Sequence, residues 1–120
     1  MKRESDKFLM LTRHNSEIRA SFNHVTRLTV LDIEAIRLEL LDEVSKKGVT
    51  LEIDLSNIEF VDSAVIDVFN LLSRLALRYQ SLVKLVHVTE ELMELITLVR
   101  HHAVFDIRYI NNLYLSRSVA

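Results

Sequence analysis

The near absence of glycine and proline restricts this chain more than any other property of its sequence. It has a single glycine, Gly48, and no proline, where average usage would give about eight and about six. Phosphate-binding loops, the dinucleotide fingerprint and the Gly-x-Ser-x-Gly nucleophile turn all need glycine where the backbone turns tightly or touches a ligand. The sequence therefore excludes the enzyme classes that depend on these motifs.

Charge and cysteine content exclude further classes. Fifteen Lys and Arg against seventeen Asp and Glu give a net charge of −2, so the chain lacks the basic field of a nucleic-acid binder. Without any cysteine it has no disulfide, thiol nucleophile or Cys-based metal site. The apolar run after Lys2 and Arg3, residues 8–11, is too short for a signal peptide or a membrane span. We expect a soluble, cytoplasmic protein with no direct membrane insertion.

The pattern along the chain predicts one domain over residues 1–120 that begins with a β-hairpin. Residues 1–7 are polar and are expected to fray. In 17–22, Ile18, Ala20 and Phe22 alternate with polar residues, which is the period of a strand. A turn at Asn15-Ser16 would join this strand to the preceding one.

Helices and strands alternate after the hairpin. Thr29 and Asp32 have the spacing of a capping box that opens a helix, and Gly48 is a typical stop. We expect strands over 8–14, 17–22, 49–55, 82–88 and 104–110, and helices over 29–47, 63–79 and 89–101, in the order β-β-α-β-α-β-α-β; the tail 111–120 is uncertain. Helical spacing points these residues inward: Val30, Ile33, Ile36, Leu40, Leu41 and Val44 in the first helix, and Val65, Val68, Phe69, Leu72, Leu75, Ala76 and Tyr79 in the second.

The expected strand over 49–55 alternates between apolar and polar residues. Leu51 and Ile53 are separated by Glu52 and Asp54. A parallel strand covered by helices on both faces would be almost continuously apolar. We therefore expect an α/β fold with a mixed sheet whose helices pack mainly on one face, and Glu52 and Asp54 more exposed than their apolar neighbours.

The histidines and clustered carboxylates do not form a catalytic or metal-binding pattern. His101 and His102 are adjacent, so on a helix they diverge by about 100° and cannot chelate as a pair four residues apart would. His87 precedes Glu90 by three residues, which suggests a base and its orienting carboxylate. A polar residue at a strand end, beside a capped helix, explains this spacing equally well. We expect no enzymatic activity, no metal and no cofactor.

Asp62 and Ser63 stand where a strand and a short connection lead into a long helix. The hydroxyl of Ser63 would lie near the unpaired amide groups and the positive end of that helix. Such a position favours an added phosphate. The simpler interpretation is that Asp62 or Ser63 is only the N-cap of the helix.

The segment 53–63 (IDLSNIEFVDS), followed by an apolar helix, resembles the signature of the STAS domain, the fold of bacterial anti-sigma factor antagonists that is also found in sulfate transporters. The resemblance covers about residues 8–110. It implies a regulatory module that binds an anti-sigma factor kinase and is released when the serine after the aspartate, here Ser63, is phosphorylated. The partner-binding residues that it implies are Asp62, Ser63, Ala64 and Asp67, with Asn23 and His24 in the loop before the first helix.

The sequence departs from the family pattern at the start of this helix. Family members typically continue Asp-Ser-Ser/Thr-Gly-Leu-Gly, whereas this chain reads DSAVID from Asp62 to Asp67. In lacking both glycines, the chain resembles divergent family members. Those members are constitutive subunits of signalling scaffolds, or of the cytoplasmic side of lipid or anion transporters. Such a constitutive subunit is the alternative to a phosphorylation switch, and weak self-association is compatible with both.

A receiver domain is the remaining alternative, with Asp54 as phospho-acceptor. A receiver begins with one strand followed by a helix, and it needs an acidic pair at the end of that strand. This chain begins with a hairpin, and residues 9–14 contain no acid. The pattern therefore disfavours a receiver.

Overall fold

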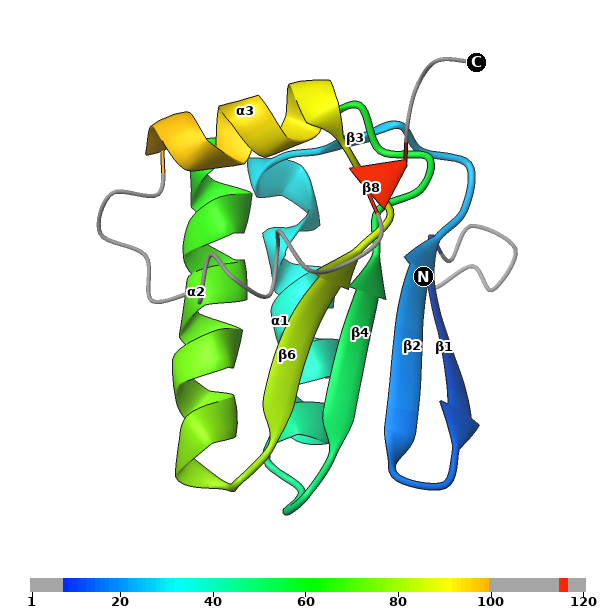
Figure 1. Ribbon diagram of the computed structural model, residues 1–120, viewed down its shortest axis with the longest axis vertical. Helices are drawn as coiled ribbons and strands as arrows, with labels where there is room; N and C mark the ends of the chain where they lie inside the picture. The colour runs from blue at the N-terminus through cyan, green and yellow to red at the C-terminus, as the bar shows by residue number, and fades with distance from the viewer. Residues whose placement is uncertain (1–7, 100–114, 117–120) are drawn as a thin grey trace.

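Four strands form a mixed sheet at the centre of the domain. The computed structural model describes residues 8–99 and 115–116. The strands lie side by side (Figure 1) in the order β1 (Leu9–His14), β2 (Glu17–Phe22), β4 (Thr50–Asp54) and β6 (Leu82–Val86). β1 and β2 are antiparallel, while β4 runs parallel to both of its neighbours. The predicted α/β class with a mixed sheet is confirmed.

Two helices cover one face of this sheet, and a third lies across its end. α1 (Ile33–Val44) and α2 (Ser63–Arg78) pack against each other and against the sheet. α3 (Glu90–Val99) lies across the end of the sheet at which β4 and β6 terminate (Figure 1). Leu51 and Ile53 are fully buried, whereas Glu52 and Asp54 are half-buried on the opposite face. For the part of the chain that the structure describes, the alternation of apolar and polar residues thus correctly predicted that the helices pack mainly on one face of the sheet.

The core lies between the sheet and the two face helices. It is entirely apolar at its centre, as the helical and strand periodicities predict. Its largest fully buried side chains are Phe69, Leu9, Leu28, Ile36, Leu40, Leu51, Ile53, Leu55, Ile58, Ile66, Leu72 and Leu85.

The first helix is shorter than predicted at both ends. The capping box of Thr29 and Asp32 is present, but it closes a 3₁₀ turn, η2 (Val30–Asp32), before α1 begins. At the other end the hydroxyl of Ser45 donates to the carbonyl of Leu41 at 2.8 Å, and this local bond competes with continued helix. Gly48, three residues later, has φ +73°, the left-handed conformation for which glycine is suited.

Two residues predicted to face the core are exposed. Val30 is 59% and Tyr79 is 41% exposed. Val30 lies in the 3₁₀ turn rather than in the α-helix, and Tyr79 follows the last helical residue as the C-cap. Helical spacing therefore does not apply to either position.

Two short parallel ladders at the same end of the sheet were not predicted. β3 (Arg27–Leu28) pairs with β5 (Phe60–Val61), and β7 (Val88–Thr89) pairs with β8 (Leu115–Ser116). Segments of two residues are too short to show a period. The Leu92 N–H donates to the hydroxyl of Thr89 at 3.1 Å, so Thr89, the first residue of the helix expected over 89–101, caps α3. The expected strand over 104–110 and the end of the third helix at 100–101 lie outside the described residues.

Candidate functional site

Asp62 is the N-cap of α2, and Ser63 is the first residue of that helix. The Val65 N–H donates to Oδ1 of Asp62 at 3.1 Å. Ser63 is exposed, and its hydroxyl has no hydrogen-bond partner among residues 8–99 and 115–116. The simple capping role therefore belongs to Asp62, and Ser63 is accessible at the positive end of a sixteen-residue helix.

The second carboxylate oxygen of Asp62 holds the neighbouring turn. Oδ2 accepts from the Val30 N–H at 3.0 Å, and the backbone N–H of Asp62 donates to the Leu28 carbonyl at 3.1 Å. One carboxylate thus satisfies the first amide of η2 and an amide in the first turn of α2. This bond spans 32 residues, so nothing in the local sequence indicates it.

Exposed apolar side chains stand beside Ser63. Leu31 is 90% and Val30 is 59% exposed, and both lie in the turn that Asp62 holds. We call Val30, Leu31, Asp62 and Ser63 the α2 N-terminal surface. The η2 turn therefore contributes two adjacent exposed apolar side chains to this surface. Helical periodicity placed Val30 in the core and gave no role to Leu31, so the sequence analysis missed the apolar part of the site.

The other predicted site residues lie on or near the same end of the domain. Ala64 is half-buried, and Asp67 is exposed one turn after Ser63. His24 is exposed with φ +66°, and the Asn23 N–H donates to the Phe8 carbonyl at 2.7 Å. The described residues show no hydrogen bond from either side chain to Asp62 or Ser63.

The loop that carries Asn23 and His24 is nevertheless connected to the approach to α2. The carbonyl of Thr26 accepts from the N–H groups of Glu59 and Phe60 at 2.7 and 3.3 Å. The guanidinium of Arg27 lies 4.4 Å from the centroid of the Phe60 ring. These contacts join β3 to β5 and place the loop at the same end of the sheet as Ser63.

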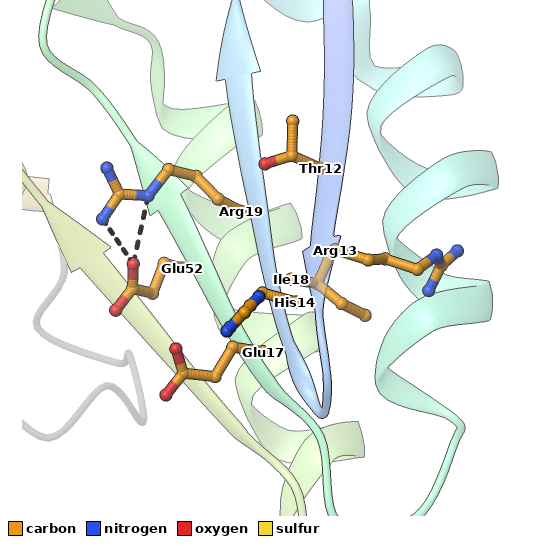
Figure 2. Close-up of a pocket in the computed structure, with 7 residues that line it drawn as sticks. All are labelled: Thr12, Arg13, His14, Glu17, Ile18, Arg19 and Glu52. Atoms are coloured by element: carbon orange, nitrogen blue, oxygen red, sulfur yellow. Dashed lines mark hydrogen bonds and ion pairs between the residues drawn. The ribbon is translucent and has the colours of Figure 1, made fainter.

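The face of the sheet opposite α1 and α2 carries a second group of polar side chains. Arg19 on β2 donates to Oε1 of Glu52 on β4 from Nε at 3.1 Å and from Nη2 at 2.6 Å, and Figure 2 shows the two side chains pointing toward each other. They line a shallow hollow of about 320 Å³ together with Thr12, His14 and Glu17. Arg13 and Ile18 also border it, although their side chains are directed toward the helix-covered face. Because Arg19 and Glu52 neutralise each other, this hollow offers little net charge to a ligand.

Asp54 is also paired on this face. Its carboxylate lies 3.0 Å from Nδ1 of His87 and 3.6 Å from Nη1 of Arg19. Burial alone would raise the pKa of Asp54, but hydrogen bonds from His87 and from the Ser56 N–H outweigh it and lower the pKa. His87 therefore contacts Asp54, in an arrangement that stabilises the end of the sheet.

Residues 8–99 and 115–116 show neither a metal site nor a helix able to span a membrane. In these ranges no cluster of three or more His, Asp or Glu side chains has a geometry that could hold a metal ion. Over the same residues, each helix falls short of the length and apolar content that crossing a bilayer requires.

Comparison with known families agrees with the arrangement of the sheet and of α2. Residues 25–106 match the family model described as "Mlab, STAS domain". The chain belongs to the STAS domain family. The match includes Asp62, Ser63, Ala64 and Asp67 and begins just after Asn23 and His24. No curated protein matches the chain in sequence. STAS domains are in general regulatory modules that bind other proteins without catalysis, so this membership gives the broad class of function.

Proposed function

We propose that this STAS domain binds a serine-kinase partner of the anti-sigma factor type through the α2 N-terminal surface, and that phosphorylation of Ser63 releases the partner. The observation that carries the proposal is the exposed Ser63 hydroxyl, one residue after a carboxylate that already caps the helix. A kinase can reach this hydroxyl without breaking a cap. A cytoplasmic location is part of the proposal.

The apolar part of the surface supports a protein partner. Leu31 and Val30 are exposed and held in place by the bond from the Val30 N–H to Asp62. An ordered apolar pair gains free energy when a partner covers it, at about 25 cal/mol per Å² of apolar surface. Asp62 caps the helix that begins at Ser63 and also holds this apolar pair. A phosphate on Ser63 would therefore lie within the surface that the partner contacts.

The charge of a phosphate explains why it would release the partner but leave the fold intact. It adds roughly −1.5 to −2 charges at pH 7. The N-terminus of α2 offsets this by about 0.3–1 kcal/mol, while Asp62 and the exposed Asp67 oppose it, so the fold should change little in stability. A charge trapped unpaired in an interface costs several kcal/mol, and about 1.4 kcal/mol is already tenfold in affinity.

The experiment is affinity purification from the native cell with the full chain as bait, with mass spectrometry of the partners and of Ser63. The purified partner is then titrated against Ser63→Glu, Ser63→Ala and Ser73→Glu, the last being the same substitution further along α2. Ser63→Glu should weaken binding at least tenfold, while Ser63→Ala and Ser73→Glu bind as the unmodified chain does. Melting temperatures should agree among all four proteins.

Equal binding by Ser63→Glu and the unmodified chain would rule out the switch. The domain would then be a constitutive subunit of a signalling scaffold or of the cytoplasmic side of a transporter, and it should co-purify with that assembly without phosphate on Ser63. The exposed Leu31 would serve a permanent contact in that case, so Leu31→Asp should weaken binding in both interpretations.

A further inference from the structure

Strand β1 forms one edge of the sheet. It is the outermost strand in the order β1-β2-β4-β6, and Figure 1 shows it furthest from β6. Its six residues pair with β2 in an unbroken register from Leu9↔Phe22 to His14↔Glu17. Among the described residues, no strand pairs with its outer side.

The hydrogen bonding to β2 determines which backbone groups of β1 point outward. The Asn23 N–H donates to the Phe8 carbonyl at 2.7 Å, so residues 8 and 23 form a hydrogen-bonded pair in this register. Hydrogen-bonded and non-hydrogen-bonded pairs alternate along an antiparallel ladder. Residues 10, 12 and 14 therefore bond to β2, and the N–H and C=O groups of Leu9, Leu11 and Arg13 point away from it.

This edge carries no lysine, proline or bulge, three of the features with which proteins block strand addition; a charged side chain is another such feature. Its only Lys, Arg, Asp or Glu side chain is Arg13. The guanidinium of Arg13 is bound to Glu43 of α1 at 3.0 and 2.7 Å, and Figure 2 shows it directed toward that helix, away from β2. The one charge that could repel an added strand is thus neutralised on the helix-covered face.

We propose that two copies of this chain associate by antiparallel pairing of their β1 strands around a two-fold axis through Leu11. A two-fold axis perpendicular to the sheet keeps the helix-covered faces of both copies on one side. Leu9, Leu11 and Arg13 face α1, so they must pair among themselves across the axis: Leu11 with Leu11 of the second copy, Leu9 with its Arg13, and Arg13 with its Leu9. These are the residues whose backbone groups point outward, so each of the three pairs forms two hydrogen bonds.

The side chains on the open face fit the same register. Met10, which is 44% exposed, comes opposite Thr12 of the second copy, and no like charges are placed opposite each other. The edge is thus complementary to itself, which is why a second copy is the partner that fits. An interface made by one strand edge buries less than about 1,200 Å², so the association is weak.

Charge substitutions at Met10 and Thr12 test the register, since both side chains are exposed. Met10→Glu/Thr12→Glu and Met10→Lys/Thr12→Lys each place two like-charged pairs across the axis and should weaken association at least tenfold. Met10→Glu/Thr12→Lys places opposite charges there and should associate at least as tightly as the unmodified chain. Sedimentation equilibrium from about 10 μM to about 1 mM measures this, and equal melting temperatures show that the variants fold.

A single introduced cysteine gives an independent measurement, because the chain has none. Cα atoms of a hydrogen-bonded antiparallel pair lie about 5.5 Å apart, within the range of a disulfide. Leu11→Cys should therefore cross-link between copies. Thr12→Cys should cross-link much more slowly, because position 12 lies opposite Met10 of the second copy and two residues away from position 12 of that copy. The proposal is overturned if the unmodified chain stays monomeric at about 1 mM, or if the two like-charged variants associate as tightly as it does.

Discussion

Arg13 on β1 and Glu43 on α1 form a bidentate ion pair, with guanidinium-to-carboxylate distances of 3.0 and 2.7 Å. The Glu43 side chain is almost completely buried, whereas that of Arg13 is half exposed. Lys46 adds a third hydrogen bond to Glu43 at 3.1 Å. The hydrogen bond from Arg13 outweighs burial and lowers the pKa of Glu43, and the same bond raises the pKa of Arg13. The pair fastens the edge strand to the first helix.

Replacing Glu43 by Gln should remove a pH-dependent part of the stability. Since the pKa of Glu43 in the fold lies below its ordinary value of about 4.3, its carboxylate stabilises the fold above that pH and loses this effect as the pH falls through the folded pKa. We expect Glu43→Gln to lower the free energy of unfolding by about 1 kcal/mol at pH 7, a value reduced for solvent screening, and by much less at pH 3. Urea unfolding at both pH values measures this, with the exposed Asp42→Asn as control. A loss of equal size at both pH values would contradict the assignment.

Asp62 should show two separable roles when it is replaced. Asp62→Ala removes both acceptors and should cost about 1–2 kcal/mol of stability, as for other N-caps. Asp62→Ser keeps an oxygen for the Val65 N–H but cannot also reach the Val30 N–H, so it should cost less. Amide hydrogen exchange should become faster at Val30 in both variants and at Val65 only in Asp62→Ala. Unchanged exchange at Val30 in Asp62→Ser would show that the turn is held by other contacts.

The backbone at His87 should tolerate glycine better than a β-branched residue. His87 has φ +60°, a left-handed conformation that costs most side chains about 1–2 kcal/mol. Both His87→Gly and His87→Val remove the hydrogen bond to Asp54, so their difference isolates the backbone effect. We expect His87→Val to be about 1–2 kcal/mol less stable than His87→Gly in thermal or urea unfolding. Equal stability would indicate that the chain relaxes out of this conformation.

Truncation of two apolar residues on α2 should change the stability of the fold by very different amounts. Phe69 is fully buried and Leu77 is 66% exposed. Phe69→Ala leaves a cavity between α2 and the sheet and should cost about 3–5 kcal/mol, while Leu77→Ala should stay within about 0.5 kcal/mol of the unmodified chain. Denaturant unfolding checks both, and an effect of Leu77→Ala above 1 kcal/mol would mean that this exposed leucine packs against another part of the chain.

Local patterns in the sequence were sufficient for much of the fold. The alternation of Leu51 and Ile53 with Glu52 and Asp54 predicted a sheet with one polar face, because side-chain direction in a strand depends only on position. The caps at Thr29, Asp62 and Thr89 are also local, since the capping oxygen and the amide it binds lie within three residues. The motif at Asp62 and Ser63 indicated the STAS family on the same basis.

Contacts between distant segments decided the rest. Asp62 binds the Val30 amide across 32 residues, and Arg13 binds Glu43 across 30; neither pair leaves a local pattern. Val30 belongs to an apolar helical repeat by sequence, yet the 3₁₀ turn before α1 turns it outward beside Ser63. Periodicity records which face of an element is apolar, whereas the partner of each face is set by how the chain closes over many residues, where loop entropy, packing and buried hydrogen bonds compete.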